Sequence, residues 1–410
     1  MELLKKIVDR DGLSRIEDEL ETAKEICRYL GYLPLALELA ATYLVEDEML
    51  TLGEYWEQLN LQDRSISDEM VKYITAERGV VSAFALSWLR LRDLSPQVAM
   101  LLGRFASADI PWQDLVEPTV KSLGWDETAV RKGRIQLANL HLISIQEQKN
   151  IGIHSLLREY FRWQGNLEGD DFIHFLQRGI TATGISIAKS IPQTPIKADI
   201  ERVRFAVPHL ELLSLDMLDD IPNPEKDLLW AFTGIARFYE GQGFYSISEN
   251  TCQRCLKVIQ ELLGEFHPDV VLILNDLAFL YSSQGRYEEA EPLYKQALSL
   301  YQQVFSGKHH PIIATIINNL AALYELQGRY EEAEPLCRQA LLLCQELLGE
   351  RHPDVANSIN NLAGLYDSQG RYEEAEPLYV KALEILEISL GKEHPNTKIC
   401  RNSLQSLRDQ

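Results

Sequence analysis

Apolar residues in the C-terminal half of the chain recur at helical spacing, in pairs of segments separated by a short polar turn. In "NDLAFLYSSQGRY", Leu277, Leu280 and Tyr281 fall on one side of a helix. Gly285 suits the turn that follows, because glycine readily adopts the left-handed backbone that ends many helices. A second apolar stripe comes next, at Ala290, Leu293, Tyr294, Ala297 and Leu298. The pattern predicts two helices joined at Gly285.

This helix pair is repeated along the chain. "GRYEEAEPLYKQAL" begins at Gly285, and nearly the same phrase begins at Gly328 and at Gly370, in steps of 43 and 42 residues. A His-Pro dipeptide keeps the same register at positions 267, 310, 352 and 394. Two markers with one period indicate a repeat array. Since a single helix pair cannot bury its own apolar stripe, we expect the pairs to stack into an α-solenoid.

The repeats resemble the tetratricopeptide repeat, in the 42-residue form found in kinesin light chains. The resemblance rests on "NNLAxLYxxQGRYEEAEPLYxxAL" and on the His-Pro spacer, over about residues 226–395. A weaker first copy precedes the three clear ones, with Gly243 placed 42 residues before Gly285. The segment "NTKICRNSLQSL" after Pro395 resembles the capping helix of such arrays. We therefore expect about four repeats and a cap.

In that family the first helix of each repeat lines a concave groove that binds a protein or peptide. The resemblance places on this groove Thr233, Arg237, Asn275, Asn318, Glu325, Asn357, Asn360 and Asp367. Asparagine carries a hydrogen-bond donor and an acceptor, so a series of them can hold the backbone of an extended peptide. The alternative is that the asparagines only solvate an exposed face. The groove lacks a run of Lys and Arg for an acidic carboxylate, so a basic or apolar peptide suits it better.

The front part of the chain contains "EICRYLGYLPLALELAATYL", from Glu25 to Leu44. By itself the pattern predicts two helices with a break at Gly-Tyr-Leu-Pro. The segment also resembles the Gly-Leu-Pro-Leu-Ala-Leu motif of the STAND class of signalling NTPases, which includes the NB-ARC and NLR-type switches. In that class the proline of the motif contacts the nucleotide base, a role that the resemblance gives to Pro34. A tyrosine stands where the class prefers a short apolar residue.

The segments downstream fit the same resemblance. Residues 83–115 predict two amphipathic helices, residues 126–144 predict a third, and "LISIQEQKNIGIH" predicts a hairpin with a polar turn at Gln146–Asn150. Three helices and a hairpin make a winged-helix domain, which STAND proteins carry at this point. "IGIHSLLREYFR" resembles their Met-His-Asp motif, whose histidine senses the β-phosphate of ADP. His154 takes that position, while Ile153 and Ser155 replace the methionine and the aspartate.

A nucleotide-binding P-loop, G-x-x-x-x-G-K-[ST], is absent from the sequence. "SGKHH" and "LGKEH" lie at repeat junctions and lack both the glycine-rich lead and the Ser or Thr that binds magnesium. We therefore expect no ATP hydrolysis by this chain, and no cofactor of its own. Pro34 and His154 could contact ADP or ATP only if a STAND NTPase core came from a longer parent protein or a separate chain.

The net charge of −21 and the pI near 4.9 argue against general binding to nucleic acids or membrane surfaces, because both are polyanions. One local exception is "AVRKGRIQL", which places Arg131, Lys132 and Arg134 on the helix that reads DNA in winged-helix regulators. The sequence shows no signal peptide and no apolar span of membrane length, and its six cysteines form no disulfide or zinc pattern. These features predict a cytoplasmic protein without a metal site.

The sequence as a whole predicts a mainly α protein, with a winged-helix domain and an α-solenoid of tetratricopeptide helix pairs. We expect a helical NB-ARC-like segment at 1–78, the winged-helix domain at 79–165, a helical connector at 166–224, and the repeats with their cap at 225–410. The main hypothesis is a non-catalytic sensor or scaffold arm of a STAND-type signalling system, whose groove binds the ligand and whose winged helix is the coupling element. The alternatives are a free-standing adaptor with a relic front half, and a transcriptional regulator that contacts DNA through the winged helix.

Overall fold

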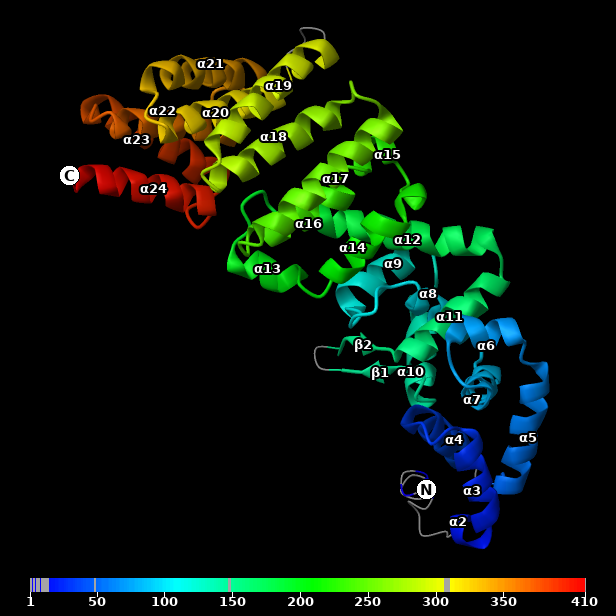
Figure 1. The fold of residues 1–410 in the computed structure, drawn as a ribbon. Coiled ribbons are helices and arrows are strands. Elements are labelled where there is room, and N and C mark those ends of the chain that lie inside the picture. The colour runs from blue at the N-terminus through cyan, green and yellow to red at the C-terminus, as the bar shows by residue number, and fades with distance from the viewer. Residues whose placement is uncertain are drawn as a thin grey trace. The chain divides into compact units, whose positions relative to one another are not determined.

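The computed structural model describes residues 15–47, 49–146, 149–305 and 310–409, together with residues 2, 4 and 8 (Figure 1). The predicted hairpin turn and the "SGKHH" junction lie partly outside these residues. Helices form nearly all of the regular structure, which confirms the mainly α fold class. The chain divides into two compact units, residues 1–234 (unit 1) and residues 235–410 (unit 2). Across the described residues, no helix is both long enough and apolar enough to cross a lipid bilayer.

Unit 1 begins with five helices. They are α2 (Arg15–Asp18), α3 (Leu20–Tyr29), α4 (Pro34–Glu46), α5 (Leu52–Ser65) and α6 (Asp68–Ile74). Thr51 and Glu54 form a reciprocal capping box at the start of α5. The turn before α4 has left-handed backbone at both Gly31 and Tyr32. This turn is the break predicted between the two helices of the Gly-Tyr-Leu-Pro segment.

The middle of unit 1 combines helices with one short hairpin. Its elements are α7 (Arg78–Leu89), α8 (Ser95–Gly103), the π-helix η1 (Trp112–Val116), α9 (Glu117–Ser122), α10 (Glu127–Asn139), β1 (Ser144–Ile145), β2 (Ile151–Gly152) and α11 (Ser155–Leu167). The strands pair antiparallel, and Ile110 adds one antiparallel bridge to Ile151. The predicted helices and the hairpin are present in the predicted order. The sequence analysis did not single out η1 and α9, because each covers fewer than two helical turns.

Helices also form the rest of unit 1. They are α12 (Asp170–Lys189), α13 (Lys197–Val203), α14 (Val207–Asp216), the 3₁₀ helix η3 (Leu218–Asp220) and α15 (Pro224–Asp227). One apolar core extends through the unit from Leu4 to Met217. Its packing leaves little room at Gly79 in α7, where an added Cβ would lie 2.2 Å from the carbonyl oxygen of Tyr29. The core therefore depends on contacts between residues far apart in the sequence.

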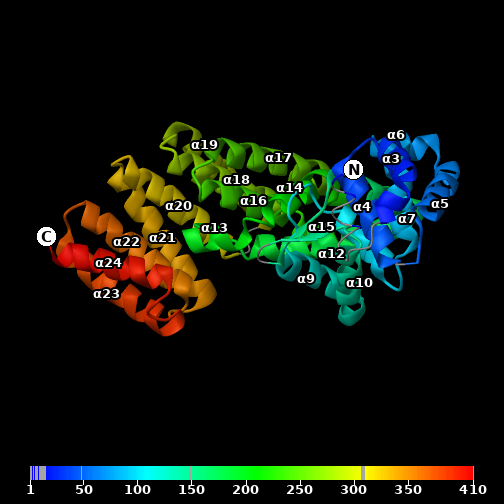
Figure 2. The same ribbon diagram turned by 90° about the horizontal axis from the view of Figure 1, so that it is seen from below.

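Unit 2 is a series of helix pairs that lie side by side (Figure 1, Figure 2). Its first helices are α16 (Trp230–Glu240), which begins in unit 1, α18 (Pro268–Ser283), α20 (Ile312–Leu326) and α22 (Pro353–Ser368). Its second helices are α17 (Tyr245–Leu263), α19 (Tyr287–Phe305), α21 (Tyr330–Leu348) and α23 (Tyr372–Ser389), and α24 (Pro395–Arg408) follows them. The turn glycines 243, 285, 328 and 370 all have φ between 71° and 78°, as the repeat pattern predicts.

The repeated His-Pro marker has a local structural role. His267 precedes α18, and its Nδ1 accepts a hydrogen bond from the Asp269 amide at 3.2 Å. His352 and His394 cap α22 and α24 in the same way. The proline that follows each of these histidines is the first residue of the helix, where a missing N–H group leaves no hydrogen bond unmade. The marker thus starts a first helix in these repeats.

Each copy of "GRYEEAEP" joins its repeat to the one before. Arg329 places its guanidinium 4.0 Å from the centre of the Tyr324 ring and donates a 2.8 Å hydrogen bond to Glu291 in α19. The Tyr324 hydroxyl donates to the same carboxylate at 3.0 Å. These bonds, led by that from Arg329, lower the pKa of Glu291 to about 2. Two further sets repeat this inter-repeat clasp, namely Arg286, Tyr281 and Glu249, and Arg371, Tyr366 and Glu334.

The first helices lie on the inner side of unit 2. Neighbouring first helices contact each other more extensively than neighbouring second helices do, and α22 contacts α24 in the same manner. A stack of helix pairs whose neighbouring helices lie closer together on one side curves toward that side. The first helices therefore form the concave wall, as the resemblance to tetratricopeptide repeats implies.

Candidate ligand-binding groove and front-unit cavities

The concave wall of unit 2 carries most of the residues predicted to contact a ligand. Asn275, Asn318 and Asn360 occupy the same position in α18, α20 and α22. Asn357 lies one turn earlier in α22 than Asn360. Glu325 and Asp367 share a position nearer to the ends of α20 and α22. The repeat thus places side chains of one kind at regular intervals along the wall.

Two of the predicted contact residues are not available at the surface. Thr233 and Asn275 are each only 2% exposed. The Thr233 hydroxyl donates to the carbonyl of Leu229, the residue just before its own helix, and the Asn275 Oδ1 accepts from Asn319 in α20 at 3.0 Å. Both side chains stabilise the structure itself, which corrects the prediction that they line an open groove. The burial of a polar side chain depends on its neighbours and is not visible in the residue type.

The remaining asparagines are half-buried, and two of them connect neighbouring helices. Asn318 donates to the Ser358 hydroxyl in α22 at 2.9 Å, and Asn357 accepts from Asn396 in α24 at 3.4 Å. Among the described residues, the Oδ1 atoms of Asn318 and Asn360 have no hydrogen-bond partner. The asparagines therefore hold the first helices together, and two of them keep an unused acceptor.

Carboxylates gather toward the ends of the first helices. Ser368 donates to Glu325 at 2.7 Å, and burial together with the nearby charge of Asp367 raises the pKa of Glu325. Arg237 in α16, another predicted groove residue, lies 3.8 Å from Asp276 in α18. The sequence analysis missed Glu240, although it has the same repeat position as Glu325 and Asp367.

Burial and the charge of Asp276 raise the pKa of Glu240 to about 7. Burial also raises the pKa of Asp276, against the opposing effect of Arg237. Burial is the largest cause at both carboxyl groups, because it disfavours their charged forms. Carboxyl groups therefore line this part of the concave wall.

The two residues assigned to nucleotide binding lie in different parts of unit 1. Pro34 is exposed at the first position of α4 and lines none of the cavities described below. His154 precedes α11 and is exposed, and its Nδ1 accepts from the Leu156 amide at 3.3 Å. This bond fixes the neutral tautomer with the proton on Nε2, so that Nε2 can donate to a phosphate oxygen.

His154 lines a cavity of about 450 Å³ together with Ser107, Asp109, Ser144 and Arg158. Arg158 is only 2% exposed and donates to the carbonyl oxygens of Phe105 and Ala108 at 3.0 and 3.4 Å. Its burial lowers the pKa of the guanidinium to about 10, which leaves it cationic at neutral pH. The cavity thus combines a cation, a carboxylate and hydroxyl groups beside the start of α11.

One wall of this cavity is a loop that a buried histidine holds in place. His209 of α14 accepts a hydrogen bond from the Ala106 amide at 3.0 Å and donates to the Asp109 carbonyl at 3.1 Å. Burial lowers the pKa of His209 to about 4, so the ring is neutral at physiological pH. Arg158 of α11 and His209 of α14 therefore both hold this loop, from positions about 50 and 100 residues later in the sequence.

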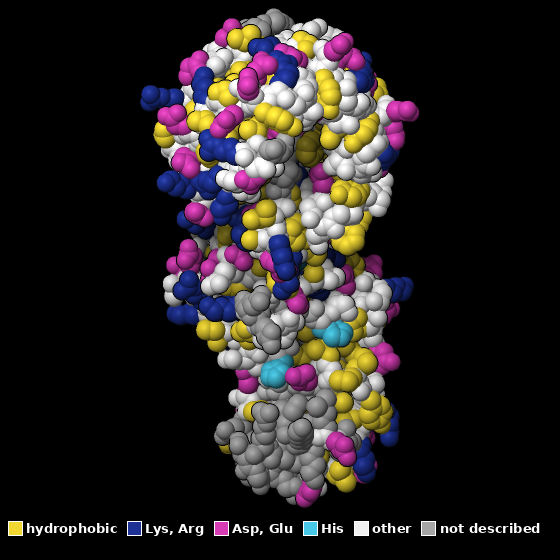
Figure 3. Space-filling model, turned by 90° about the vertical axis from the view of Figure 1, so that its left-hand side faces the viewer, with side chains coloured by type: hydrophobic (Ala, Val, Ile, Leu, Met, Phe, Trp, Pro, Cys, Tyr) yellow, Lys and Arg dark blue, Asp and Glu magenta, His cyan; other side chains and the backbone are white. Residues whose placement is uncertain are grey.

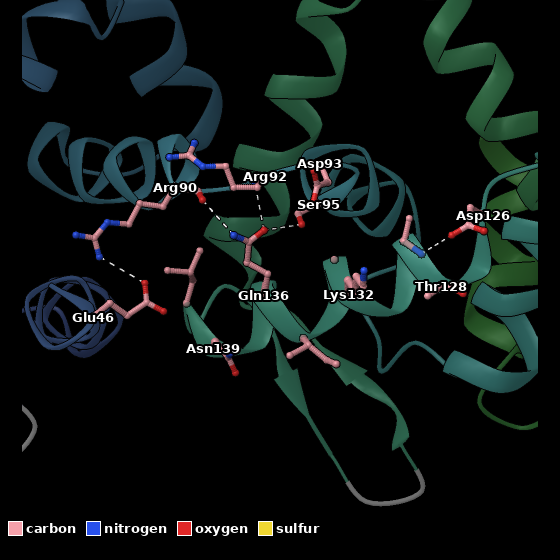
Figure 4. A pocket seen from close by; sticks show the side chains of 14 residues that line it. Glu46, Arg90, Arg92, Asp93, Ser95, Asp126, Thr128, Lys132, Gln136 and Asn139 are labelled. Atoms are coloured by element: carbon pink, nitrogen blue, oxygen red, sulfur yellow. Dashed lines mark hydrogen bonds and ion pairs between the residues drawn. The ribbon is translucent and has the colours of Figure 1, made fainter.

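A larger cavity of about 750 Å³ lies against α10 (Figure 4). The Gln136 side chain closes part of its wall, since it accepts from the Arg92 amide and the Ser95 hydroxyl and donates to the Arg90 carbonyl. Arg90 in turn reaches Glu46 at 3.4 Å. The cavity is thus bounded by α4, by the turn between α7 and α8, and by α10.

The three basic residues of α10 do not form one positive surface. Arg131 pairs with Glu117 at 3.7 Å, Arg134 lies over the Trp112 ring at 4.5 Å, and Lys132 lines the large cavity. Figure 3 shows Lys and Arg side chains intermixed with Asp and Glu on one face of the molecule. This arrangement gives no support to the regulator hypothesis, because DNA binding requires a continuous basic area.

The six cysteines are all buried, and none of them is in a disulfide. Among the described residues, no group of three or more His, Cys, Asp or Glu side chains is arranged to hold a metal ion. Burial raises the pKa of Cys252 and Cys255 well above the usual value, so neither thiol is activated.

Comparison with known proteins supports the repeat assignment. Residues 227–303 and 312–388 match the tetratricopeptide repeat family, and a second description of the same repeat matches residues 275–347. A nucleotide-binding leucine-rich repeat (NLR)-like protein of Hyaloscypha variabilis is 31% identical over 295 residues, which cover 67% of this chain and 27% of the relative. The chain thus spans about a quarter of that relative's length.

Three solved structures are similar at low TM-scores. BtubC from P. vanneervenii is 25% identical and covers 56% of this chain and 83% of its own, with a TM-score of 0.42. A kinesin light chain-like repeat protein of Podosopora anserina is 23% identical and covers 46% and 88%, with a TM-score of 0.38. A STAND protein with a tetratricopeptide repeat sensor from Pyrococcus horikoshii is 14% identical and covers 92% and 62%, with a TM-score of 0.26.

The family match begins at residue 227, so it includes the weaker first copy at α16 and α17 as well as the three clear repeats. The turn glycines, the inter-repeat clasps and the concave row of first helices agree with this match. Within the C-terminal half, residues 227–388 are therefore tetratricopeptide repeats.

Proposed function

We propose that this chain is the ligand-sensing and coupling part of a STAND-type signalling protein, and that it is not itself an enzyme. The repeats of unit 2 bind a protein or peptide along their concave wall. The segment from α7 to α11 is the winged-helix coupling element, and it relays ligand binding to a nucleotide switch. His154 contacts the β-phosphate of ADP when a STAND NTPase core is supplied.

The observation that carries the proposal is the extent of the similarity to the NLR-like relative. A match to 67% of the chain is longer than the repeat half and therefore includes part of unit 1. Similarity to the repeats alone would be equally compatible with a free-standing adaptor. The order of helices, hairpin and His154 in unit 1 supports the same assignment.

The experiment that tests ligand binding uses the full chain and a displayed library of random 12-residue peptides. Selected peptides are labelled, and their affinity is measured by fluorescence polarisation. Asn318→Arg combined with Asn360→Arg is expected to weaken binding at least about tenfold, because the bulky cations block the concave wall. Glu331→Gln with Glu373→Gln makes the same change in net charge at exposed positions of the second helices, and it should leave the affinity within about twofold.

Two results would contradict the proposal. The first is a library selection that returns no peptide binder for the native chain. The second is equal loss of affinity in the groove variant and in the matched control. Circular dichroism of both variants shows whether their helices remain folded.

A further inference from the structure

The cavity beside His154 has one wall made of a short loop, residues 104–109, which we call the cavity loop. It follows α8, and three of its residues, Ser107, Ala108 and Asp109, line the cavity. The cavity loop belongs to no helix or strand. Side chains from other elements must therefore bond to its backbone and set its conformation.

One side of the cavity loop is tied to α11, the helix that begins directly after His154. Arg158 donates to the carbonyl oxygens of Phe105 and Ala108 at 3.0 and 3.4 Å, and Arg162 donates to Phe105 at 3.4 Å. Arg158 also lines the cavity. The loop and the start of α11 therefore hold each other on the cavity side.

The other side of the cavity loop is tied to His209 of α14, which is only 2% exposed. Its Nδ1 accepts from the Ala106 amide at 3.0 Å, and its Nε2 donates to the Asp109 carbonyl at 3.1 Å. The ring also meets Phe105 edge-on, with the ring centres 5.4 Å apart. One side chain thus contacts three residues of the loop. Since a buried hydrogen bond is costly to leave unmade, a shift of His209 should move the loop with it.

His209 is placed by the packing of α14, a helix of the predicted connector. At Gly184 of α12, an added Cβ would lie 2.7 Å from Cδ1 of Leu213 in α14, so the two helices are closely packed. The repeat match begins at residue 227, soon after α14 ends at Asp216. The last long helix before the repeats therefore also supplies the hydrogen bonds of His209 to the cavity loop.

We propose that His209 is a positioning residue of the relay, which sets the cavity loop according to the position of α14. The inference rests on the proposed function, and it adds the side chain through which the connector acts on the cavity beside His154. Such a linkage is reciprocal. Ligand binding in the groove changes the cavity loop, and a group that occupies the cavity favours one position of α14.

The test is hydrogen exchange followed by mass spectrometry, on the full chain with and without a peptide selected from the library. In the native chain, peptide binding should change the exchange rate of residues 104–111 at least about fivefold, the lower end of ordinary coupling between sites. His209→Phe keeps an aromatic ring against Phe105 and removes both hydrogen bonds to the loop. It should bind the peptide within about twofold of the native affinity and lose the change in the loop.

Two further variants sharpen the result. His209→Gln can still donate to the Asp109 carbonyl, so it should keep part of the change. His174→Gln alters another histidine of the connector, one that is half-exposed and bonds to Asp220 at 2.8 Å, and it should keep the whole change. Circular dichroism checks the fold of each variant. If His209→Phe does not fold, His209→Gln decides the question, and an undiminished change in that variant would overturn the proposal.

The outcomes separate this inference from the proposed function. A histidine that only stabilises the core would raise the exchange of unit 1 when substituted, but it would leave the peptide-induced change in place. That result, or a native chain that binds peptide with no change at residues 104–111, overturns the inference and leaves ligand binding intact. If the native chain selects no peptide, the proposed function and the inference fail together. Loss of the change in His209→Phe with its affinity kept supports both.

Discussion

Unit 1 and unit 2 are both helical, but they are held together by different kinds of contact. In unit 1, Arg158 reaches the Phe105 carbonyl and His209 binds the loop at Ala106, contacts that occur once and join residues far apart in the sequence. In unit 2, the same clasp of tyrosine, arginine and glutamate joins one repeat to the next three times. Loss of one contact should therefore disturb much of unit 1 but only one junction of unit 2.

The sharpest way to test this difference is the same substitution at one glycine of each unit. Gly79→Ala in α7 should destabilise unit 1 by about 3 kcal/mol, because the added Cβ overlaps the Tyr29 carbonyl. Gly364→Ala in α22 should stabilise its repeat by about 0.5–1 kcal/mol, because the position has room and alanine favours a helix. Hydrogen exchange followed by mass spectrometry reports each unit separately.

The critical result of that experiment is that the two substitutions change stability in opposite directions. Gly53→Ala in α5 is a control within unit 1, since its added Cβ has no neighbour closer than 3.4 Å. Similar destabilisation by Gly79→Ala and Gly53→Ala would mean that helical glycine itself, rather than crowding against Tyr29, sets the effect.

Removing one arginine from each unit should give a smaller contrast. Arg158→Met leaves the carbonyl groups of Phe105 and Ala108 without their donor, and it should destabilise unit 1 by about 2–3 kcal/mol. Arg329→Met removes one clasp whose arginine is one-third exposed, so it should destabilise the protein less than Arg158→Met does. Exchange should increase across α7 to α11 in the first variant, but only around α19 to α21 in the second. Uniform loss of protection along unit 2 would contradict the local action of the clasp.

The smallest expected effect is an opposite response of the two units to mild acid. His209 has its pKa lowered to about 4 by burial, so its stabilising effect on unit 1 is complete above pH 6.5 and is lost as the pH falls toward 4. Glu240 has its pKa raised to about 7, so its stabilising effect on unit 2 is present below pH 4.5 and is lost as the pH rises through 7. As the pH falls from 7 to 5, unit 1 should become less stable and unit 2 should become more stable.

The responses can be assigned to these two groups by removing them. His209→Gln should flatten the pH dependence of exchange in unit 1, and Glu240→Gln should flatten it in unit 2. Asp276 and Arg237 face Glu240, and burial raises the pKa of Asp276 as well, so any protonation of Asp276 acts in the same direction as that of Glu240. If the stability of both units changes in the same direction with pH in the native chain, then His209 and Glu240 do not dominate the pH dependence.

The sequence predicted the parts of the structure that depend on repetition or on local spacing. The helix pairs, their turn glycines and the Gly-Tyr-Leu-Pro break all follow from residues that lie close together in the chain. The inter-repeat clasp was not predicted, although the sequence motif that forms it is the most regularly repeated one in the chain. Repetition shows that Arg329 matters to its repeat, but not that its partner is Glu291 in the previous one.

The groove residues show the same limit on what can be predicted from the sequence. Glu325 and Asp367 were placed on the wall by the resemblance to the repeat family, whereas Glu240, at the same repeat position, was not among the predicted residues. Ser282 stands at this position in the repeat between them. The burial of Asn275 could not be predicted either, since Asn318 has the same repeat position and remains half-buried. What differs is the surroundings, such as Asp276 beside Asn275 where later repeats have Asn319 and Asn361. Residue types fix the wall's chemistry, and the neighbours decide which groups a ligand can reach.

The clasp has a consequence for how such a gene can evolve. Every clasp joins an arginine to a glutamate 37 or 38 residues earlier. In α24, Arg408 pairs with Glu376, the glutamate of the last repeat, from 32 residues later and at 2.8 Å. Duplication or deletion of one whole 42-residue unit by recombination would leave each arginine with a glutamate of matching geometry. Repeat number can therefore vary between descendants without compensating mutations at the junctions.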